Sequence, residues 1–419
     1  MGGWIVKKLR GFLTRYVRAQ PRAGDEEGAE RRVYILLMAA WGMGGTIRTT
    51  LNFAGHLASQ GYDVEILSIG RGRDKPFFGE FPEGVKVTVL DDKRRSKEPS
   101  RLLHPLRYAM RRRSSVLVHP VDRAAKGFNL WVDWQLVKRL RRKTGYLIGT
   151  RPGLNLLAVD LSPPGLVRIG QEHMHLQEHD EILQRAIKRL YPKLDALTVL
   201  TEKDRKRYGK HLHGRVPVAR IPNTVRDLGD VQADLSAKRV LTAGRFHRQK
   251  GYDRLIKTWE MIADKHPDWE LKICGEGPWQ EKLELMIERR GLGGSVTLAG
   301  PSKDLGAEMA QASIFVLSSR WEGLPLVLIE AMSVGMAVVS FDCPTGPAEV
   351  IDDHVNGLLI RPRKMEVLGA GLSEMMSSEE LRRRCAAGAV ETAREYSMDV
   401  VGPRWESVLS EAREKHAAA

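Results

Sequence analysis

The chain has 419 residues, of which 42% are hydrophobic and 28% charged, and its formal net charge is +15 at pH 7. This length exceeds what one hydrophobic core of ordinary size accommodates, so we expect two domains of a globular protein. The three cysteines, Cys274, Cys343 and Cys385, have no metal-ligand or CxxC spacing, which argues against a disulfide framework or structural zinc and favours a reducing cytosol. The sequence predicts neither a membrane-spanning segment nor a signal peptide.

Residues 1–31 form a predicted basic extension. Residues 1–20 repeat apolar side chains at helical spacing and carry basic residues on the other face. This pattern is typical of an amphipathic helix lying in a membrane interface, and a disordered tail or a helix packed on the protein body is the alternative that stays open. The apolar positions are Ile5, Leu9, Phe12, Leu13, Tyr16 and Val17. Residues 21–31, rich in Gly, Glu and Ala, predict a tether.

Residues 32–225 are predicted to form the first Rossmann-like domain. The apolar run Val33–Ala40 predicts a buried strand, a glycine turn containing Gly44 and Gly45 follows it, and a second strand is expected around Val64–Ile69. Glycines in this turn allow the backbone to approach a phosphate or a sugar closely, although a tight turn without a ligand is the alternative. The string GMGG is not a complete GxGxxG, so a dinucleotide site is poorly supported.

The net positive charge belongs to the first third of the chain. Residues 1–150 contain 29 Lys and Arg against 14 Asp and Glu, whereas residues 151–419 contain 38 of each. A one-sided charge indicates a partner, either anionic lipid or an anionic polymer, and a solvated surface is the alternative. Nucleic acid is disfavoured because no aromatic residues interleave with the arginines. The cations singled out are Arg94, Arg95, Arg101, Arg107, Arg111, Arg112, Arg113, Arg141, Arg142 and Lys143.

Three histidines, His173, His175 and His179, follow an apolar run that predicts another strand of this domain. Carboxyl ends of parallel strands point toward the ligand site of such sheets, so we expect these side chains near a ligand. Their spacing matches no settled metal geometry, and we expect no metal site.

The polar stretch 226–238 is the predicted linker, and residues 239–395 form the predicted second Rossmann-like domain. Its strands are expected at 239–243, 270–274, 295–299, 313–318 and 337–341. A helical stretch is predicted from about Ser378 to Lys415, and we expect residues 396–419 to return to the first domain. The predicted class is therefore α/β with two doubly wound domains.

A series of motifs in fixed order marks the second half of the chain. Arg245 and Lys250 stand five positions apart in GRFHRQKG, and Glu322 and Glu330 stand eight positions apart in an EGxP…EAM context. IPN at 221–223 precedes them and GEGP at 275–278 lies between. The ordered set resembles the retaining GT-B glycosyltransferases of family 4. The strings DCPTGPAEVI and EHMH…LTEKD resemble bacterial enzymes that decorate teichoic acid or surface polysaccharide.

The resemblance, over about residues 33–400, implies two Rossmann-like domains facing a central cleft, with the acceptor bound by the first domain and a nucleotide-sugar by the second. Negative charge grows on the departing diphosphate, and no Asp-x-Asp stands at a strand end to hold a metal there. Arg245 and Lys250 are therefore expected to take up that charge, through a planar fork and a compact ammonium. Ordinary surface cations are the alternative.

The loop after strand 313–318 is expected to complete the donor site. Pro325 suits the first position of a helix that stops at Gly335, and the amides of Gly323 and Leu324 face the donor at its positive end. The resemblance implies that Glu322 binds hydroxyls of the donor sugar. It implies that Glu330 binds the ribose, whose vicinal hydroxyls a carboxylate accepts from in pairs; a solvated helix position is the alternative for Glu330.

The resemblance implies three further contacts. His173 is expected against the donor sugar, Gly44 and Gly45 in the donor or acceptor pocket, and Gly275 and Gly277 near the nucleotide. None of these roles is worked out from spacing alone.

The predicted reaction is retaining transfer of a hexose or N-acetylhexosamine from a nucleotide diphosphate sugar, with UDP favoured. The acceptor is a cell-envelope polymer, a glycolipid or another hydroxyl compound, and no metal or further cofactor is expected. The expected location is cytoplasmic and peripheral at the inner face of the membrane. The alternatives are a nucleotide-sugar epimerase of the same fold, a GDP-mannose-dependent mannosyltransferase and a catalytically inactive binding protein.

Overall fold

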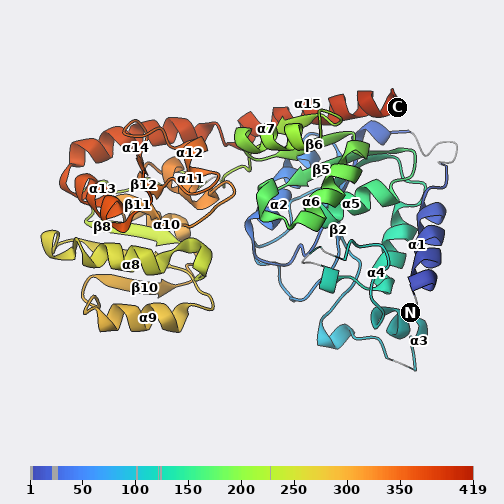
Figure 1. Cartoon of the computed structure of the whole chain (residues 1–419), viewed down its shortest axis with the longest axis horizontal. Helices are drawn as coiled ribbons and strands as arrows, with labels where there is room; N and C mark the ends of the chain where they lie inside the picture. Colours follow the sequence, from blue (N-terminus) through green and yellow to red (C-terminus); the bar gives the residue numbers. More distant parts are fainter. Residues whose placement is uncertain are drawn as a thin grey trace. The chain divides into compact units, whose positions relative to one another are not determined.

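The computed structural model describes residues 3–20, 27–100, 102–120, 122, 125–226 and 228–418. The chain divides into two compact units, unit 1 with Met1–Ile221 and Gly402–Ala419 and unit 2 with Pro222–Val401 (Figure 1). Most of the predicted tether, residues 21–26, and Arg101 lie outside the described residues. Among those that are described, no helix is long and apolar enough to cross a bilayer.

Unit 1 is built on a parallel sheet of seven strands in the order β3-β2-β1-β4-β5-β6-β7. The strands are β1 Arg32–Leu37, β2 Asp63–Ser68, β3 Val85–Val89, β4 Gly145–Gly149, β5 Leu166–Glu172, β6 Ala196–Val199 and β7 Val218–Arg220. The helices are α1 Gly3–Val17, α2 Gly45–Ser59, α3 Pro105–Arg111, α4 Leu130–Leu140, α5 Pro152–Leu161, α6 Glu181–Leu190 and α7 Glu202–His211. Short 3-10 turns occur at Ala29–Arg31, Arg95–Lys97, Ala125–Gly127, Leu176–Glu178 and Tyr191–Lys193.

Unit 2 repeats this plan with a parallel sheet of six strands in the order β10-β9-β8-β11-β12-β13. The strands are β8 Arg239–Ala243, β9 Glu270–Cys274, β10 Val296–Gly300, β11 Ile314–Leu317, β12 Ala337–Phe341 and β13 Leu358–Ile360. The helices are α8 Tyr252–Glu260, α9 Gln280–Arg289, α10 Leu305–Ala310, α11 Leu326–Ser333, α12 Pro347–Val350, α13 Met365–Ser377 and α14 Glu379–Arg394. The last helix, α15 Met398–Ala417, begins in unit 2 and continues in unit 1 from Gly402. Short 3-10 turns lie at Arg248–Lys250 and Ala263–Lys265.

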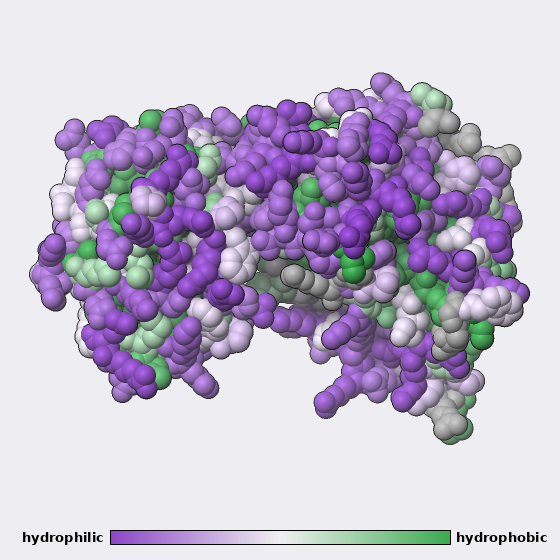
Figure 2. Space-filling view, in the orientation of Figure 1, coloured by the Kyte–Doolittle hydropathy of each residue, from purple (hydrophilic) through white to green (hydrophobic). Residues whose placement is uncertain are grey.

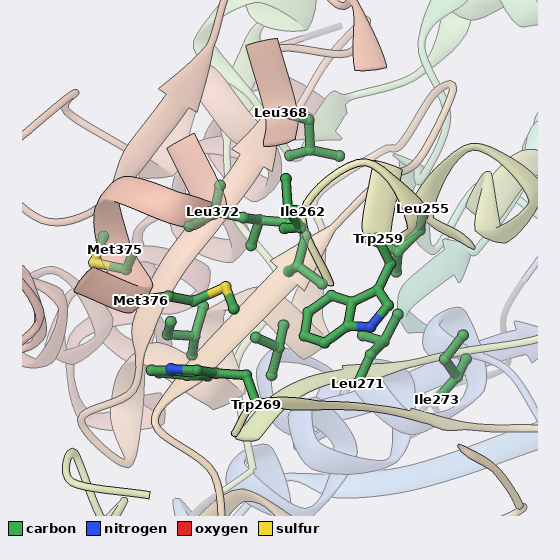
Figure 3. Close-up of a cluster of buried hydrophobic side chains, with 14 of the residues drawn as sticks. Leu255, Trp259, Ile262, Trp269, Leu271, Ile273, Leu368, Leu372, Met375 and Met376 are labelled. Carbon is green, nitrogen blue, oxygen red and sulfur yellow. The ribbon is translucent and has the colours of Figure 1, made fainter. Parts of the chain in front are cut away.

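Both parallel sheets are built from short strands of mainly buried, apolar residues. Every residue of β4, β11 and β12 is buried, because helices cover both faces of a parallel sheet. Figure 2 shows mainly hydrophilic side chains on the visible face, with hydrophobic ones in separate patches. In unit 2 the indole of Trp259 on α8 and that of Trp269 before β9 pack with Leu271 and with Leu372 and Met376 of α13 (Figure 3). The predicted α/β class with two Rossmann-like domains is thus confirmed.

Four local predictions need correction. The strand β13 was not predicted, because only three residues of an apolar stretch after Gly357 pair with β12. The single helical stretch from Ser378 to Lys415 is two helices, since Glu395–Ser397 separate α14 from α15. Pro325 precedes α11 rather than opening it. The sequence of residues 90–127, rich in Arg and Lys, predicts a loop, but α3 lies within it.

The N-terminal segment is a helix that packs on unit 1. Leu13 and Val17 of α1 are buried in the core that also contains residues of α4 and α5, and Leu9 packs against it. Arg10 forms an ion pair with Asp160 at the end of α5. Of the two interpretations left open by the sequence, the stripe containing Leu9, Leu13 and Val17 therefore covers the protein body and is unavailable to a membrane.

The end of α15 is fixed to unit 1 by a charged cluster. His416 Nδ1 lies 3.1 Å from Asp195 Oδ2, and Arg168 Nη2 lies 2.9 Å from Asp195 Oδ1. Burial alone would raise the pKa of Asp195, but the hydrogen bonds from His416 and Arg168 outweigh it and lower the pKa to about 2. The same hydrogen bond to Asp195 raises the pKa of His416 above its ordinary value.

A pH-dependent contribution to stability follows. Because the folded-state pKa of His416 exceeds its unfolded value, its stabilisation is complete below about pH 6.5 and is lost as pH rises through the folded pKa. We expect His416→Gln to lower the urea midpoint of unfolding more at about pH 6 than at about pH 8.5. The exposed His104 supplies the control, since His104→Gln should leave the midpoint unchanged at both values. A His416→Gln effect that is equal at both pH values would contradict the protonated pair.

Candidate functional site

The order of the strands predicts where a ligand binds in each unit, before any side chain is considered. In unit 2 the chain winds outward from β8 through β9 to β10 and then returns to β11 on the other side of β8. In unit 1 the same reversal lies between β1 and β4. Ligands of doubly wound sheets bind beyond the carboxyl ends of the strands at such a reversal. The loops after β8 and β11, and those after β1 and β4, are therefore the natural places for a ligand.

At the strand reversal of unit 2, two of the predicted site residues are in contact. Lys250 Nζ lies 2.7 Å from Glu322 Oε1, and Ser319 Oγ donates to the same oxygen at 2.5 Å. The side chain of Lys250 is 18% exposed and that of Glu322 only 8%. The structure thus forms a largely buried ion pair from residues that the sequence assigned to separate tasks.

Backbone contacts interlock the two loops that carry this pair. Gln249 Nε2 donates to Trp321 O, and Ser318 Oγ donates to Lys250 O at 2.9 Å. Gly251 has a φ of +69°, and a Cβ there would lie 2.2 Å from Ser318 O. Only glycine combines this conformation with so close an approach. The position of Lys250 is therefore fixed by the chain on both sides of it.

A third loop, from β12, supports Glu322 from behind. Thr345 Oγ1 donates a short hydrogen bond to Glu322 O, and Glu322 N donates to Pro344 O at 3.3 Å. Gly346 has a φ of +95°, and a Cβ there would lie 2.1 Å from Gly323 O. The string DCPTGP, noted in the sequence only for its resemblance, holds the carboxylate-bearing loop in place. No pattern in the sequence indicates this role.

Arg245 lies on the same loop as Lys250, and its side chain is exposed. The loop runs beside the glycine loop after β9, since Phe246 N donates to Glu276 O at 2.8 Å. A Cβ at Gly275 would lie 2.0 Å from Gly244 O, and one at Gly277 would lie 2.6 Å from Phe246 O. Gly275 and Gly277 therefore allow the two loops to touch and bring the predicted nucleotide loop next to Arg245.

Helix α11 begins at Leu326, directly after Gly323, Leu324 and Pro325. Gly335, with a φ of +76°, follows its end, as predicted for a helix stop. Glu330 on this helix is only 4% exposed. Glu330 also interacts with other groups of the chain. Because Glu330 is buried, it is not the solvated helix position that was the alternative, and its ribose role remains a prediction from the resemblance.

In unit 1 the loops after β1, β4 and β5 enclose a pocket of about 310 Å³. Gly44, Gly45 and His173 all line it, so the structure brings together the three predicted residues of this unit. Gly44 has a φ of +149° and stands immediately before α2. Arg151 and Asp122, which also line the pocket, form an ion pair at 2.7 Å and were not predicted from the sequence.

A buried carboxylate stands beside this pocket. Glu172, the last residue of β5, is 1% exposed, and Asn155 Nδ2 donates to its Oε1 at 3.0 Å. Tyr191 Oη donates a short hydrogen bond to the same oxygen, and His179 Nε2 lies 3.5 Å from Oε2. Burial and the charge of Glu172 raise the pKa of Tyr191 well above its ordinary value. The network fixes the end of β5, from which His173 follows.

Two of the three histidines lie near separate carboxylates. His179 faces Glu172, and His175 Nε2 lies 3.2 Å from Glu178 Oε1. Across the described ranges, no group of three or more His, Cys, Asp or Glu side chains is arranged to hold a metal ion.

Comparison with known proteins places these loops in a family. Residues 228–392 match the family described as Glycosyl transferases group 1. An exopolysaccharide phosphotransferase of Streptomyces coelicolor is 33% identical over 391 residues, which cover 90% of this chain and 40% of that relative. The chain thus spans less than half of that protein. The amylovoran biosynthesis glycosyltransferase AmsD of Erwinia amylovora is 26% identical over 390 residues, covering 90% of this chain and 99% of AmsD.

The fold is also found in a solved structure. A Staphylococcus aureus TarM mutant in complex with fondaparinux, alpha-GlcNAc-glycerol and UDP aligns with a TM-score of 0.73 at 16% identity, covering 90% of this chain and 99% of TarM. At this identity the likeness concerns the fold, which is the GT-B fold. With the two doubly wound sheets, these comparisons show that the chain has the GT-B fold and carries a group 1 glycosyl transferase domain at residues 228–392.

Proposed function

We propose that the protein is a retaining glycosyltransferase that moves a hexose or N-acetylhexosamine from a UDP-sugar to a hydroxyl of a cell-envelope polymer or lipid-linked acceptor, without a metal ion. The observation that carries the proposal is the Lys250–Glu322 pair at the strand reversal of unit 2. The matched AmsD is a glycosyltransferase of amylovoran biosynthesis, and the TarM structure contains UDP and alpha-GlcNAc-glycerol, which supports the donor and acceptor classes. The choice of UDP over GDP and the assignment to family 4 stay predictions.

The main chemical task of the proposed site is to stabilise the nucleotide diphosphate as it leaves. When the anomeric C–O bond breaks, negative charge grows on the β-phosphate, and fixed cations stabilise it without reorganisation. The ammonium of Lys250 has three donors, of which Glu322 takes one, so two remain for phosphate oxygens. Arg245, exposed on the same loop, supplies the second cation. The first amides of the α11 region, at Gly323 and Leu324, add the positive end of a helix.

Glu322 has one carboxylate oxygen to offer a sugar. Its Oε1 is taken by Lys250 and Ser319, whereas the contacts of the described residues leave Oε2 without a partner. A hydroxyl of the donor sugar can donate to Oε2, and the pair then couples recognition of the sugar to the position of the phosphate cation. His173, Gly44 and Gly45 are proposed to contact the sugar, Gly275 and Gly277 the nucleotide, and Glu330 the ribose.

Retention is proposed to follow from attack on the face that the diphosphate leaves. The departing phosphate oxygen then accepts the proton of the acceptor hydroxyl, so a second catalytic carboxylate is unnecessary, in contrast to retaining glycosidases, which need two. The three cysteines are free and buried, which agrees with the proposed location on the cytoplasmic side of the membrane.

The name of the Streptomyces relative raises one competing reaction, transfer of a sugar phosphate. The two reactions break different bonds. Sugar transfer cleaves the anomeric C–O bond and releases UDP, whereas sugar-phosphate transfer cleaves the P–O–P bridge and releases UMP. The chain covers only 40% of that relative but 99% of AmsD, which favours sugar transfer.

The nucleotide product tests the proposal directly. We expect incubation with UDP-sugar and a glycan acceptor to release UDP and not UMP, to give a product with the anomeric configuration of the donor by NMR, and to proceed unchanged in EDTA. UMP would identify a phosphotransferase, conversion of the UDP-sugar to its epimer without net release of UDP would favour an epimerase, and donor binding without any turnover would favour a binding protein. Loss of activity in EDTA would contradict metal independence.

The Lys250–Glu322 pair makes a second prediction. Lys250→Met should lower kcat about 100-fold or more, because it removes charge stabilisation of the leaving group. It should also destabilise unit 2 by about 3 kcal/mol, since it leaves the buried carboxylate of Glu322 unpaired. The double variant Lys250→Met with Glu322→Gln should recover stability in urea unfolding without recovering turnover.

The exposed Lys257 on α8 supplies the matched control, and Lys257→Met should leave kcat and stability unchanged. Arg245→Gln should reduce kcat with no loss of stability, because its side chain is exposed. Full turnover of the Lys250→Met variant would exclude Lys250 as the phosphate cation.

A further inference from the structure

Exposed apolar side chains collect on two elements of unit 1. Trp4 and Phe12 of α1 are 68% and 52% exposed. Leu102 and Leu103, just before α3, are 90% and 78% exposed, and Leu106 in its first turn is 71% exposed. With Ile5, these residues are called the α1/α3 surface. Figure 2 shows green side chains along the right-hand edge and lower right-hand corner, where Figure 1 places α1 and α3. This exposure in water calls for a partner.

Both elements rest on the same helix, α4. The ring of Tyr16 on α1 stacks on Trp134 at 6.0 Å between centroids, and the Arg107 guanidinium of α3 lies 5.4 Å from the Trp131 ring. The segment after α3 is fixed as well, because Asp133 of α4 accepts hydrogen bonds from Ser115 Oγ and from a backbone amide, each at 2.7 Å. The two apolar groups are therefore carried by one rigid support.

Cations surround the α1/α3 surface. Residues 3–20 contain no acid, and residues 93–120 contain nine Lys and Arg against the single acid Glu98. Arg94 and Arg111 are paired with Asp92 and Asp91, so they do not add free charge. The exposed cations that remain on or beside the two helices are Lys7, Lys8, Arg15, Arg18, Arg112 and Arg113.

We propose that the α1/α3 surface docks on an anionic phospholipid bilayer, with its tryptophan, phenylalanine and leucines in the headgroup region and its cations against lipid phosphates. A bilayer meets both features at once, since buried apolar area and attraction to anionic lipid add in interfacial binding. A soluble polyanion would neutralise the cations and leave Leu102 and Leu103 in water. This proposal rests on the proposed function in one respect only, namely that docking brings unit 1 to an envelope acceptor.

This surface differs from the one that the sequence predicted. The helical stripe through Leu9, Leu13 and Val17 is used for packing on unit 1, and the lipid contact comes from other positions of α1 together with α3.

Sedimentation with vesicles tests the proposal on the full chain without donor or acceptor. We expect binding to vesicles of phosphatidylcholine with about 30% phosphatidylglycerol, little binding to phosphatidylcholine alone, and weakening with salt. Leu102→Asn with Leu103→Asn should weaken binding at least tenfold, and Lys7→Gln with Lys8→Gln should weaken it by about fivefold per charge. The control Met261→Asn with Leu285→Asn alters exposed apolar residues of unit 2 and should bind as the wild type does.

The outcomes separate this proposal from the reaction. Equal vesicle binding by the Leu102/Leu103 variant and the wild type would overturn it, as would binding to soluble polyphosphate that exceeds binding to anionic vesicles. The variant with Lys250→Met and Glu322→Gln should bind vesicles normally although it transfers no sugar. Lipid binding that disappears in that variant would show that the α1/α3 surface is not the docking site.

Discussion

The ion pair between Lys250 and Glu322 is the constraint on which the rest of unit 2 depends. Two charges are withdrawn from water, and this is tolerated only when each finds the other in good geometry. The geometry requires loops from β8, β11 and β12 to meet, and the sheet order puts these three strands next to one another. Gly251 and Gly346 then let the backbones approach to distances that any side chain would forbid. A donor phosphate that takes hydrogen bonds from Lys250 enters a site already assembled by the fold.

The sequence predicted what depends on local patterning. Strands β8, β9 and β12 were placed to the residue, because buried parallel strands are short apolar runs between polar turns. The positions of Arg245, Lys250, Glu322 and His173 at strand ends followed from the same reading. What it missed are contacts between distant residues: the pairing of Lys250 with Glu322, the support from Thr345, and the network around Glu172. None of these contacts leaves a pattern in the neighbouring sequence, because the sequence around a glutamate at a strand end is the same whether or not a lysine from another loop pairs with it.

Helix α1 shows why a periodic pattern has more than one outcome. An apolar stripe at helical spacing reports that one face avoids water, but it does not say whether protein or lipid covers that face. The structure decides, because Leu13 and Val17 are buried against unit 1. The predicted helix is therefore confirmed, but only the tertiary packing shows that protein, and not lipid, covers its apolar stripe.

That assignment changes how the remaining apolar residues are understood. Once the stripe of Leu9, Leu13 and Val17 accounts for folding, Trp4 and Phe12 contribute little to the stability of unit 1 and are exposed at a cost in solubility. The same is true of Leu102 and Leu103, which precede α3 and cover no core. Apolar side chains that folding does not need, carried by two elements on one support and surrounded by exposed cations, are best explained by a surface outside the protein. In the proposed function, unit 2 binds the donor through Lys250 and Arg245, and the α1/α3 surface brings unit 1 to the envelope.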